Sequence, residues 1–187
     1  MIDSSNSTDL PRSTDDEGLR SFHQRALMIL VLVFFGCVAW TWGLGWKHFY
    51  DAMETSRAVV AREMLHSGSY SVPVLDGQPY LVKPPLFYWT VLGASGIFEG
   101  VDEFTTRLPS ALSAIALMVL AFLVLDGPFT RNAAFMAAVA TGTNLLVHEK
   151  AVSGQVNMMF AFWVALSLLL LLRFRLAERP TGWFLLS

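Results

Sequence analysis

The sequence predicts an all-α integral membrane protein with about four transmembrane helices and two interfacial helices in a long first outer loop. Of its 187 residues, 54% are hydrophobic and only 15% are charged, whereas soluble domains carry about a quarter charged residues. The 13 basic and 15 acidic residues also avoid four long stretches of the chain. Composition and charge placement together exclude a freely soluble protein.

The four charge-free stretches have the lengths of membrane-spanning helices. They contain 21, 18, 16 and 22 residues and cover 26–46, 108–125, 132–147 and 151–172. A helix that crosses about 30 Å of hydrocarbon needs roughly 17–25 apolar residues. The third stretch is short, but Arg131 and Lys150 at its ends can reach the membrane surface. We therefore predict four spans within a membrane domain over 26–187.

The first stretch is predicted to be a permanent anchor rather than a cleaved signal peptide. Its apolar run exceeds the usual 7–15 residues, and no small-residue cleavage site follows it. Trp40, Trp42 and Trp46 are predicted to form an aromatic belt at its outer end. The polar residues 1–25 are expected to form a disordered cytoplasmic tail.

The positions of the basic residues predict the orientation. Short cytoplasmic segments carry an excess of Lys and Arg, and long loops contribute little to this rule. With the N-terminus inside, the inner segments contain Arg12, Arg20, Arg25, Arg131, Arg173, Arg175 and Arg179. The short outer turn then contains Lys150 alone. We predict a multi-pass protein of the inner (plasma) membrane, with loop 47–107 on the periplasmic or extracellular side.

The outer loop is predicted to begin with an amphipathic helix over 51–66. Met53, Val60 and Met64 would share one face of it. Asp51 followed three residues later by Glu54 fits a capping box at the helix start.

The rest of the loop is predicted to contain a tight turn and a second helix. Gly68 is a plausible stop for the first helix, and Asp76-Gly77 predicts a turn between two short extended pieces. Lys83-Pro84-Pro85 predicts an extended backbone. The apolar run 86–98 is too short to span and is expected to lie along the membrane interface.

Several other functions are excluded or left without support. A net charge of −2 lacks the basic footprint of a nucleic-acid-binding protein. Cys37 is the single cysteine, and it excludes a disulfide framework and a cysteine-based metal cluster. The scattered histidines His48, His66 and His148 form no metal motif, so no metal ligand is assigned.

Three sequence strings resemble a known family. They are Ala61-Arg62-Glu63-Met64-Leu65, Lys83-Pro84-Pro85-Leu86 with Tyr88-Trp89, and Arg107-Leu108-Pro109-Ser110-Ala111. Together with the span pattern over roughly 27–172, they resemble bacterial GT-C glycosyltransferases. Within these, the match is closest to the aminoarabinose transferase of lipid A, whose relatives include the protein O-mannosyltransferases. The resemblance implies the N-terminal part of a GT-C fold.

The resemblance also implies a chemistry and its catalytic residues. Family members transfer a sugar from a polyprenyl phosphate carrier to an acceptor on the outer side of the membrane. They place an Asp-Glu pair at the start of the first loop helix, where this chain has Met53 and Glu54. Glu54 and the nearby Asp51 are therefore the candidate catalytic carboxylates. The alternative is that Asp51 and Glu54 only cap the helix.

Four further residues receive roles from the resemblance. Lys83 and Tyr80 match positions associated with the donor phosphate, and a lysine binds phosphate as a point charge. The alternative is an interfacial lysine beside a belt tyrosine. Arg62 either pairs with Glu63 or lines the site. Asn157 occupies the place of a second family acid and also lines the site, without a charge.

The sequence thus predicts a glycosyltransferase, or the N-terminal fragment of one, that uses a polyprenyl-phosphate-linked sugar as its donor and has no nucleic-acid partner. The alternative is a truncated, catalytically inactive membrane protein that binds a lipid carrier or a partner subunit. Met53 and Asn157 motivate this alternative. The sugar, the acceptor, the need for a divalent metal, the oligomeric state and the completeness of the chain remain open at this stage.

Overall fold

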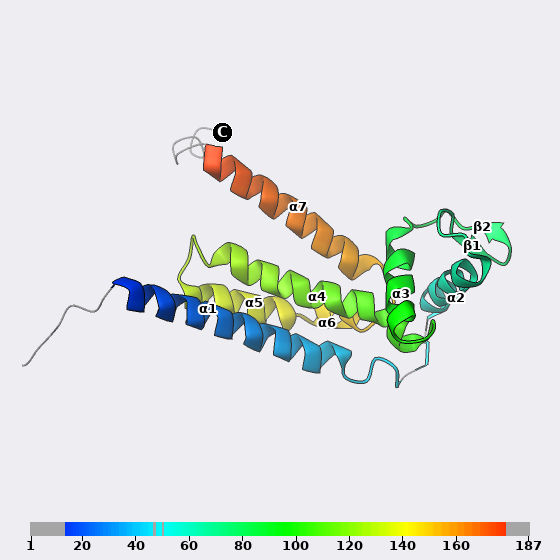
Figure 1. The fold of residues 1–187 in the computed structure, drawn as a ribbon, viewed down its shortest axis with the longest axis horizontal. Helices are drawn as coiled ribbons and strands as arrows, with labels where there is room; N and C mark the ends of the chain where they lie inside the picture. The colour runs from blue at the N-terminus through cyan, green and yellow to red at the C-terminus, as the bar shows by residue number, and fades with distance from the viewer. Residues whose placement is uncertain (1–13, 47, 50, 179–187) are drawn as a thin grey trace, which may run out of the picture.

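The computed structural model is a bundle of long helices with a smaller helical cap at one end (Figure 1). It describes residues 14–178 apart from 47 and 50, so the remainder of the predicted tail and the last residues of the predicted membrane domain lie outside the described residues. The elements are α1 (Thr14–Gly36), η1 (Cys37–Thr41), α2 (Ala52–Ser67), β1 (Val74–Leu75), β2 (Gln78–Pro79), α3 (Leu86–Ile97), α4 (Glu103–Leu125), α5 (Arg131–Gly142), α6 (Leu145–Ala151) and α7 (Asn157–Glu178).

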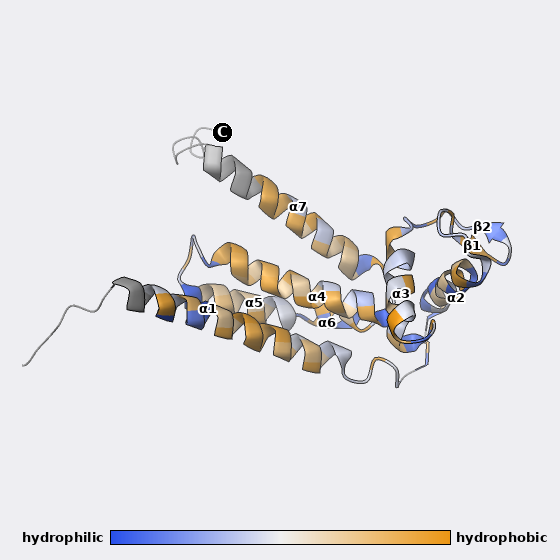
Figure 2. Ribbon diagram, in the orientation of Figure 1, coloured by the Kyte–Doolittle hydropathy of each residue, from blue (hydrophilic) through white to orange (hydrophobic). Residues whose placement is uncertain are grey.

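Helix α4 is the centre of the bundle and contacts α1, α3, α5, α6 and α7. Asp102 starts it with a capping box, in which its carboxylate accepts from the Thr105 amide at 2.7 Å. One face of α4 packs into the bundle core through the buried residues Ala111, Ala114, Ile115, Met118 and Phe122. Figure 2 shows that the bundle helices are predominantly apolar, whereas α2 and the turn after it carry more polar residues.

The first helix differs from the prediction at both of its ends. It begins at Thr14 rather than at residue 26, so the prediction of a disordered segment is wrong for 14–25. Its C-terminal end continues into the π-helical turn η1. This turn directs Trp40 into the buried cluster that includes Leu32 and Ala111, whereas Trp42 and Trp46 are exposed. Trp40 is therefore wrongly predicted as a belt residue, and a belt of Trp42 and Trp46 stays a prediction.

The stretch predicted as a third span is divided into two helices. Helix α5 ends at Gly142, and Asn144 then caps α6 by accepting from the Leu146 amide at 2.9 Å. Asparagine side chains compete with helical hydrogen bonds and favour such caps, so a continuous helix over 132–147 is wrong. Helix α7 likewise begins at Asn157 rather than at residue 151.

Two of the described helices are long and apolar enough to cross a membrane. They are Gly18–Thr41, with 24 residues, and Glu103–Leu125, with 23 residues. The described apolar part of α7, Asn157–Leu171, is shorter, and so is α3. The predicted total of four spans therefore stays a prediction.

Local signals in the outer loop are confirmed, apart from the extended backbone predicted for Lys83-Pro84-Pro85, which is wrong at Pro85. Asp51 caps α2 by accepting from the Met53 amide at 3.1 Å, and Gly68 ends the helix with a left-handed conformation at φ 67°. Asp76 and Gly77 form the turn of a small antiparallel hairpin, also with positive φ angles. Pro85 has helical rather than extended dihedral angles and leads directly into α3.

Helices α2 and α3 share a second buried cluster. It includes Val60 and Met64 from α2, together with Phe87 and Val91 from α3. Met53 does not join this face, because its side chain is 63% exposed. Packing of α3 between α2 and α4 places the outer loop on the end of the bundle (Figure 1).

Tyr88 lies in this second cluster, and its hydroxyl has no hydrogen-bond partner among the described residues. Burial raises the pKa of Tyr88 to about 12, with Tyr80 adding to the shift and Arg57 opposing it. The buried phenol therefore keeps its proton over a pH range in which the unfolded chain loses it. The folded state loses stability from this group as the pH rises from about 10 to about 12.

We predict that Tyr88→Phe leaves the protein as stable as the wild type at pH 8, or more stable by up to about 1 kcal/mol, because an unpaired buried hydroxyl is removed. Its advantage should grow by roughly 1 kcal/mol near pH 11. Thermal unfolding of both proteins in detergent at the two pH values measures this. A loss of stability at pH 8 would contradict the prediction.

Candidate functional site

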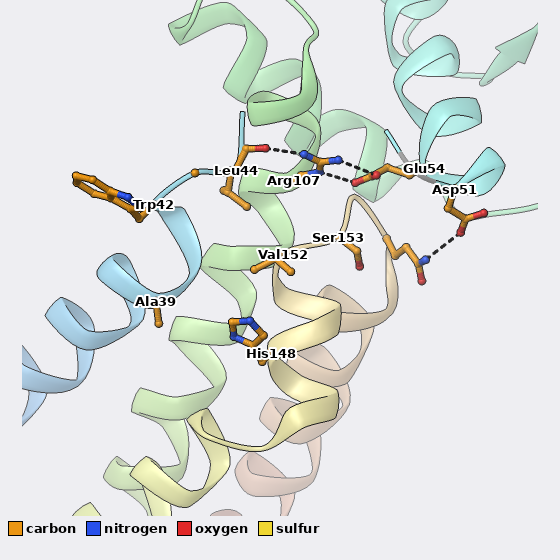
Figure 3. Close-up of a pocket in the computed structure, with 11 residues that line it drawn as sticks. Ala39, Trp42, Leu44, Asp51, Glu54, Arg107, His148, Val152 and Ser153 are labelled. Carbon is orange, nitrogen blue, oxygen red and sulfur yellow. Dashed lines mark hydrogen bonds and ion pairs between the residues drawn. The ribbon is translucent and has the colours of Figure 1, made fainter. Parts of the chain in front are cut away.

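A cavity of about 360 Å³ lies where the cap meets the bundle (Figure 3). Segments far apart in the sequence surround it: η1 and the residues after it, the start of α2, α4, and α6 with the α6–α7 connection. The lining residues are Ala39, Trp42, Gly43, Leu44, Asp51, Glu54, Arg107, His148, Val152, Ser153 and Gln155. We call this space the carboxylate cavity, after Asp51 and Glu54.

A buried ion pair between Glu54 and Arg107 forms one wall of the carboxylate cavity. Arg107 Nε donates to Glu54 Oε1 at 2.7 Å and Nη2 donates to Oε2 at 3.0 Å, so the pair is bidentate. The side chains are only 4% exposed for Arg107 and 6% for Glu54. Such paired geometry is the strongest arrangement available to a guanidinium and a carboxylate.

Backbone groups complete the environment of the ion pair. Arg107 also donates to the carbonyl oxygens of Leu44 at 2.6 Å and His48 at 3.2 Å, and it lies over the ring of Phe49. The Gly154 amide donates to Glu54 Oε1 at 2.6 Å. A Cβ at Gly154 would lie 2.8 Å from Thr106 and 3.0 Å from Glu54, so only glycine fits there.

Asp51 presents its carboxylate at the exposed side of the same cavity. One oxygen accepts from the Met53 amide, and the other accepts from Gln155 Nε2 at 3.3 Å. Figure 3 shows this second bond beside the Glu54–Arg107 pair. Asp51 is exposed, so its carboxylate is accessible to a bound molecule, in contrast to the enclosed Glu54.

A second cavity of about 380 Å³ lies next to α2. Its lining residues are Ala52, Met53, Ser56, Arg57, Tyr80, Val82, Lys83, Gln155 and Asn157. Two cations and no carboxylate border this space, so we call it the anion cavity. Gln155 lines both cavities and also accepts from Asn157 Nδ2 at 3.0 Å.

The structure groups the predicted site residues into two neighbouring sets. Asp51 and Glu54 share the carboxylate cavity, while Tyr80, Lys83 and Asn157 share the anion cavity. The capping hypothesis is confirmed for Asp51 and wrong for Glu54, because Glu54 binds Arg107 instead of the helix start.

Arg62 takes no part in either cavity. Its Nη2 donates to the Val101 carbonyl oxygen at 2.8 Å. Its predicted partner Glu63 instead accepts from the Asp76 amide at 3.0 Å, which ties the hairpin to α2. The structure therefore places Arg62 and Glu63 in contacts that hold the loop together.

Sequence reasoning did not assign a role to several residues of the site. Arg107 was noted only as part of a family string, although a charge at the edge of a long apolar stretch is itself a sign of function. Arg57 lies three residues after Glu54 on α2, and side chains at this spacing are neighbours on a helix surface. This spacing was a signal that Arg57 lies near the site. Gly154 and Gln155 carry no such signal, because their importance arises from the fold.

No metal site emerges among the described residues. Within that part of the chain, no three His, Cys, Asp or Glu side chains come together as a group that could hold an ion. His48 lies 3.4 Å from Glu103, and His148 lines the carboxylate cavity separately from it.

Comparisons with known proteins agree with the sequence resemblance. A family model described as dolichyl-phosphate-mannose-protein mannosyltransferase matches residues 82–187. The chain is 30% identical over 158 residues to an undecaprenyl phosphate-alpha-4-amino-4-deoxy-L-arabinose arabinosyl transferase of Pseudomonas fluorescens, covering 84% of this chain and 28% of that protein. A similarly named transferase of Pseudomonas savastanoi is 36% identical over 81 residues, which is 43% of this chain and 15% of that protein.

Two crystal structures have a similar fold. ArnT from Cupriavidus metallidurans in the apo state matches with a TM-score of 0.73 and 23% identity, over 82% of this chain and 28% of that chain. The same protein bound to undecaprenyl phosphate matches with a TM-score of 0.66 and 24% identity over the same shares. The chain thus spans about 28% of ArnT and of the Pseudomonas fluorescens relative.

We predict that Glu54→Leu and Arg107→Met each lower the stability of the protein by about 3–5 kcal/mol, because each leaves a buried charge without its partner. The double variant Glu54→Leu/Arg107→Met should lose less than the sum of the single losses. Thermal unfolding in detergent measures the cycle, and Arg62→Met is a control for removing an exposed arginine of α2, with the loss of its hydrogen bond to Val101. Additive losses would show that the pair is not coupled.

Proposed function

Because the chain belongs to the dolichyl-phosphate-mannose-protein mannosyltransferase family, we propose that it forms part of a membrane glycosyltransferase with a polyprenyl-phosphate-linked sugar as its donor. The observation that carries the proposal is the adjacency of the two cavities. An accessible carboxylate, Asp51, borders one of them, a lysine and a tyrosine border the other, and Gln155 lines both. A general base needs a carboxylate and phosphate binding needs a cation, and the two cavities keep these opposite charges apart.

The transfer requires one bond to form at the sugar and one to break. An acceptor hydroxyl oxygen attacks the anomeric carbon, and the bond from that carbon to the carrier phosphate oxygen breaks. The carrier leaves as a phosphate monoester that keeps the bonding electron pair. The acceptor proton passes to a carboxylate of the protein, and fixed cations stabilise the charge that develops on the phosphate.

Of the two candidate carboxylates, we favour Asp51 as the general base. A base must present an oxygen to the acceptor within hydrogen-bond reach. Both oxygens of Glu54 bind Arg107, and one also binds the Gly154 amide. We assign Glu54 the role of a positioning residue that holds the start of α2, and with it Asp51, against α4.

Lys83 and Tyr80 are proposed to bind the donor phosphate. Both border the anion cavity, and Lys83 forms no hydrogen bond or ion pair with any described residue. An unpaired ammonium beside a cavity that lacks carboxylates favours an anionic ligand. Met53 and Asn157 contribute uncharged walls to the same space.

We propose that the cavities face the outer side of the inner (plasma) membrane. Arg25 and Arg131 both bind Asp126 at the opposite end of the bundle, at 2.6 and 3.4 Å. An arginine-rich end favours the cytoplasmic side. In this arrangement α1 and α4 span the membrane together with α5–α6 and α7, while α2 and α3 lie at its outer surface.

A second candidate function is a catalytically inactive membrane protein that binds a lipid carrier or a partner subunit. The uncharged Met53 and Asn157 at the anion cavity favour this candidate, because the resemblance places acids at both positions. It retains the phosphate-binding role of Lys83 and Tyr80 and removes the role of Asp51. Activity measurements on Asp51 variants therefore separate the two candidates.

We predict that Asp51→Asn lowers sugar transfer at least a hundredfold, because the acceptor loses its base, and that it leaves donor binding within about twofold of the wild type. Lys83→Gln should weaken donor binding about tenfold or more. Membranes containing the protein are assayed with radiolabelled polyprenyl-phosphate-linked sugar, and Asp76→Asn is a matched control in the same loop. Full activity of Asp51→Asn overturns its role, and donor binding without any transfer in the wild type supports the inactive candidate.

A further inference from the structure

Arg57 is a buried guanidinium on α2 that the roles assigned above leave unexplained. The residue is only 6% exposed, yet it borders the anion cavity together with Tyr80 and Lys83. Arg57 Nη1 donates a hydrogen bond of 2.9 Å to the Met53 carbonyl oxygen, which lies on the preceding turn of the same helix. No ion pair joins Arg57 to any carboxylate in the part of the chain that the structure describes.

This environment is costly for a charged side chain. An arginine carries its charge at any physiological pH and has five N–H donors in a planar fork. Withdrawal of such a group from water is unfavourable unless an anion or several acceptors replace the water. Arg107 in the same protein meets this requirement with a carboxylate and two carbonyl oxygens. Among the described residues, the Arg57 side chain has one acceptor, the Met53 carbonyl oxygen.

The cavity beside Arg57 has the composition of a phosphate site. A guanidinium can bind two phosphate oxygens at once, and a lysine adds a point charge. Its volume of about 380 Å³ exceeds what a phosphate group alone would fill. None of its nine lining residues is an acid that could neutralise the cations.

We infer that Arg57 is the second cationic ligand of a phosphate ester in the anion cavity, where it acts together with Lys83. The inference rests on the proposed function in identifying the ester as the head of a polyprenyl carrier. Arg57 is on the same helix as Asp51 and Glu54, so one rigid element would hold the phosphate ligand and the proposed base. The missing counterion of Arg57 is then the ligand itself.

Binding of a 55-carbon polyprenyl monophosphate to the purified full chain in detergent tests the inference. Arg57→Gln should weaken this binding about 10- to 100-fold, since a charge-assisted hydrogen-bonded contact is lost. Arg57→Lys keeps the positive charge but lacks the planar guanidinium, so its affinity should lie between those of the wild type and Arg57→Gln. The corresponding polyprenol, which lacks the phosphate, should bind the wild type and Arg57→Gln equally. Arg62→Gln is the matched control on the same helix, because Arg62 lies outside the cavity.

Thermal stability separates a ligand role from a purely structural one. If Arg57 serves to bind an anionic ligand, Arg57→Met should keep or raise the melting temperature of the ligand-free protein, because an uncompensated buried charge is removed. The same variant should lose most of the stabilisation that polyprenyl phosphate gives the wild type. A lower melting temperature of ligand-free Arg57→Met, with the ligand-induced shift unchanged, overturns the inference.

Comparison with Lys83 distinguishes failure of the inference from failure of the proposed function. If Lys83→Gln weakens binding of polyprenyl phosphate and Arg57→Gln does not, the inference is wrong and the phosphate site stands. If neither variant changes binding, both are wrong. Inorganic phosphate is the probe for a free anion. If inorganic phosphate binds as tightly as polyprenyl phosphate and its binding depends on Arg57, the ligand is not a lipid carrier. If inorganic phosphate binds much more weakly, a lipid carrier is supported.

Discussion

The buried pair of Glu54 and Arg107 is the constraint on which the arrangement of the cap depends. It joins the turn after α1, the start of α2, the start of α4 and the connection before α7, through hydrogen bonds between residues up to 100 positions apart in the sequence. A bidentate pair with further backbone acceptors satisfies both charges only when all four segments are in place. The close approach of Gly154 completes the contact. The outer loop is therefore held on the bundle by a polar interaction that tolerates little displacement.

This constraint divides the acidic residues into one that holds the structure and one that remains accessible. Glu54 lies in the first turn of α2 and Asp51 is its N-cap, yet only Glu54 is enclosed. Asp51 remains at the cavity surface, where its bond to Gln155 orients the carboxylate. A general base needs both accessibility and a fixed position. The rigid pair supplies the position and the exposed cap supplies the accessibility, which is why we assign them different roles.

The parts of the fold that were predicted correctly depend on short-range signals. The cap at Asp51, the left-handed Gly68 and the Asp76-Gly77 turn each involve neighbours in the sequence. The errors depend on the tertiary structure: Trp40 turns inward at a π-helical turn, and Glu54 finds a partner 53 residues away. Periodicity cannot reveal such partners, because it describes one element at a time. The resemblance pairs Lys83 with Tyr80, and the structure places both at one cavity; their role in phosphate binding stays a prediction.

The uncharged side chains of Met53 and Asn157 affect the electrostatics of the anion cavity. Both line the anion cavity, where acids at these positions would attract Arg57 and Lys83 and compete with a phosphate for them. With uncharged side chains there, the two cations remain available to a ligand, and the space around them becomes more strongly attractive to anions. The described lining of that cavity contains no carboxylate, so under the proposed function the base is Asp51, on the other side of Gln155. Under the proposed function, uncharged side chains at these two positions are therefore compatible with tighter phosphate binding, and the cap of α2 supplies the base.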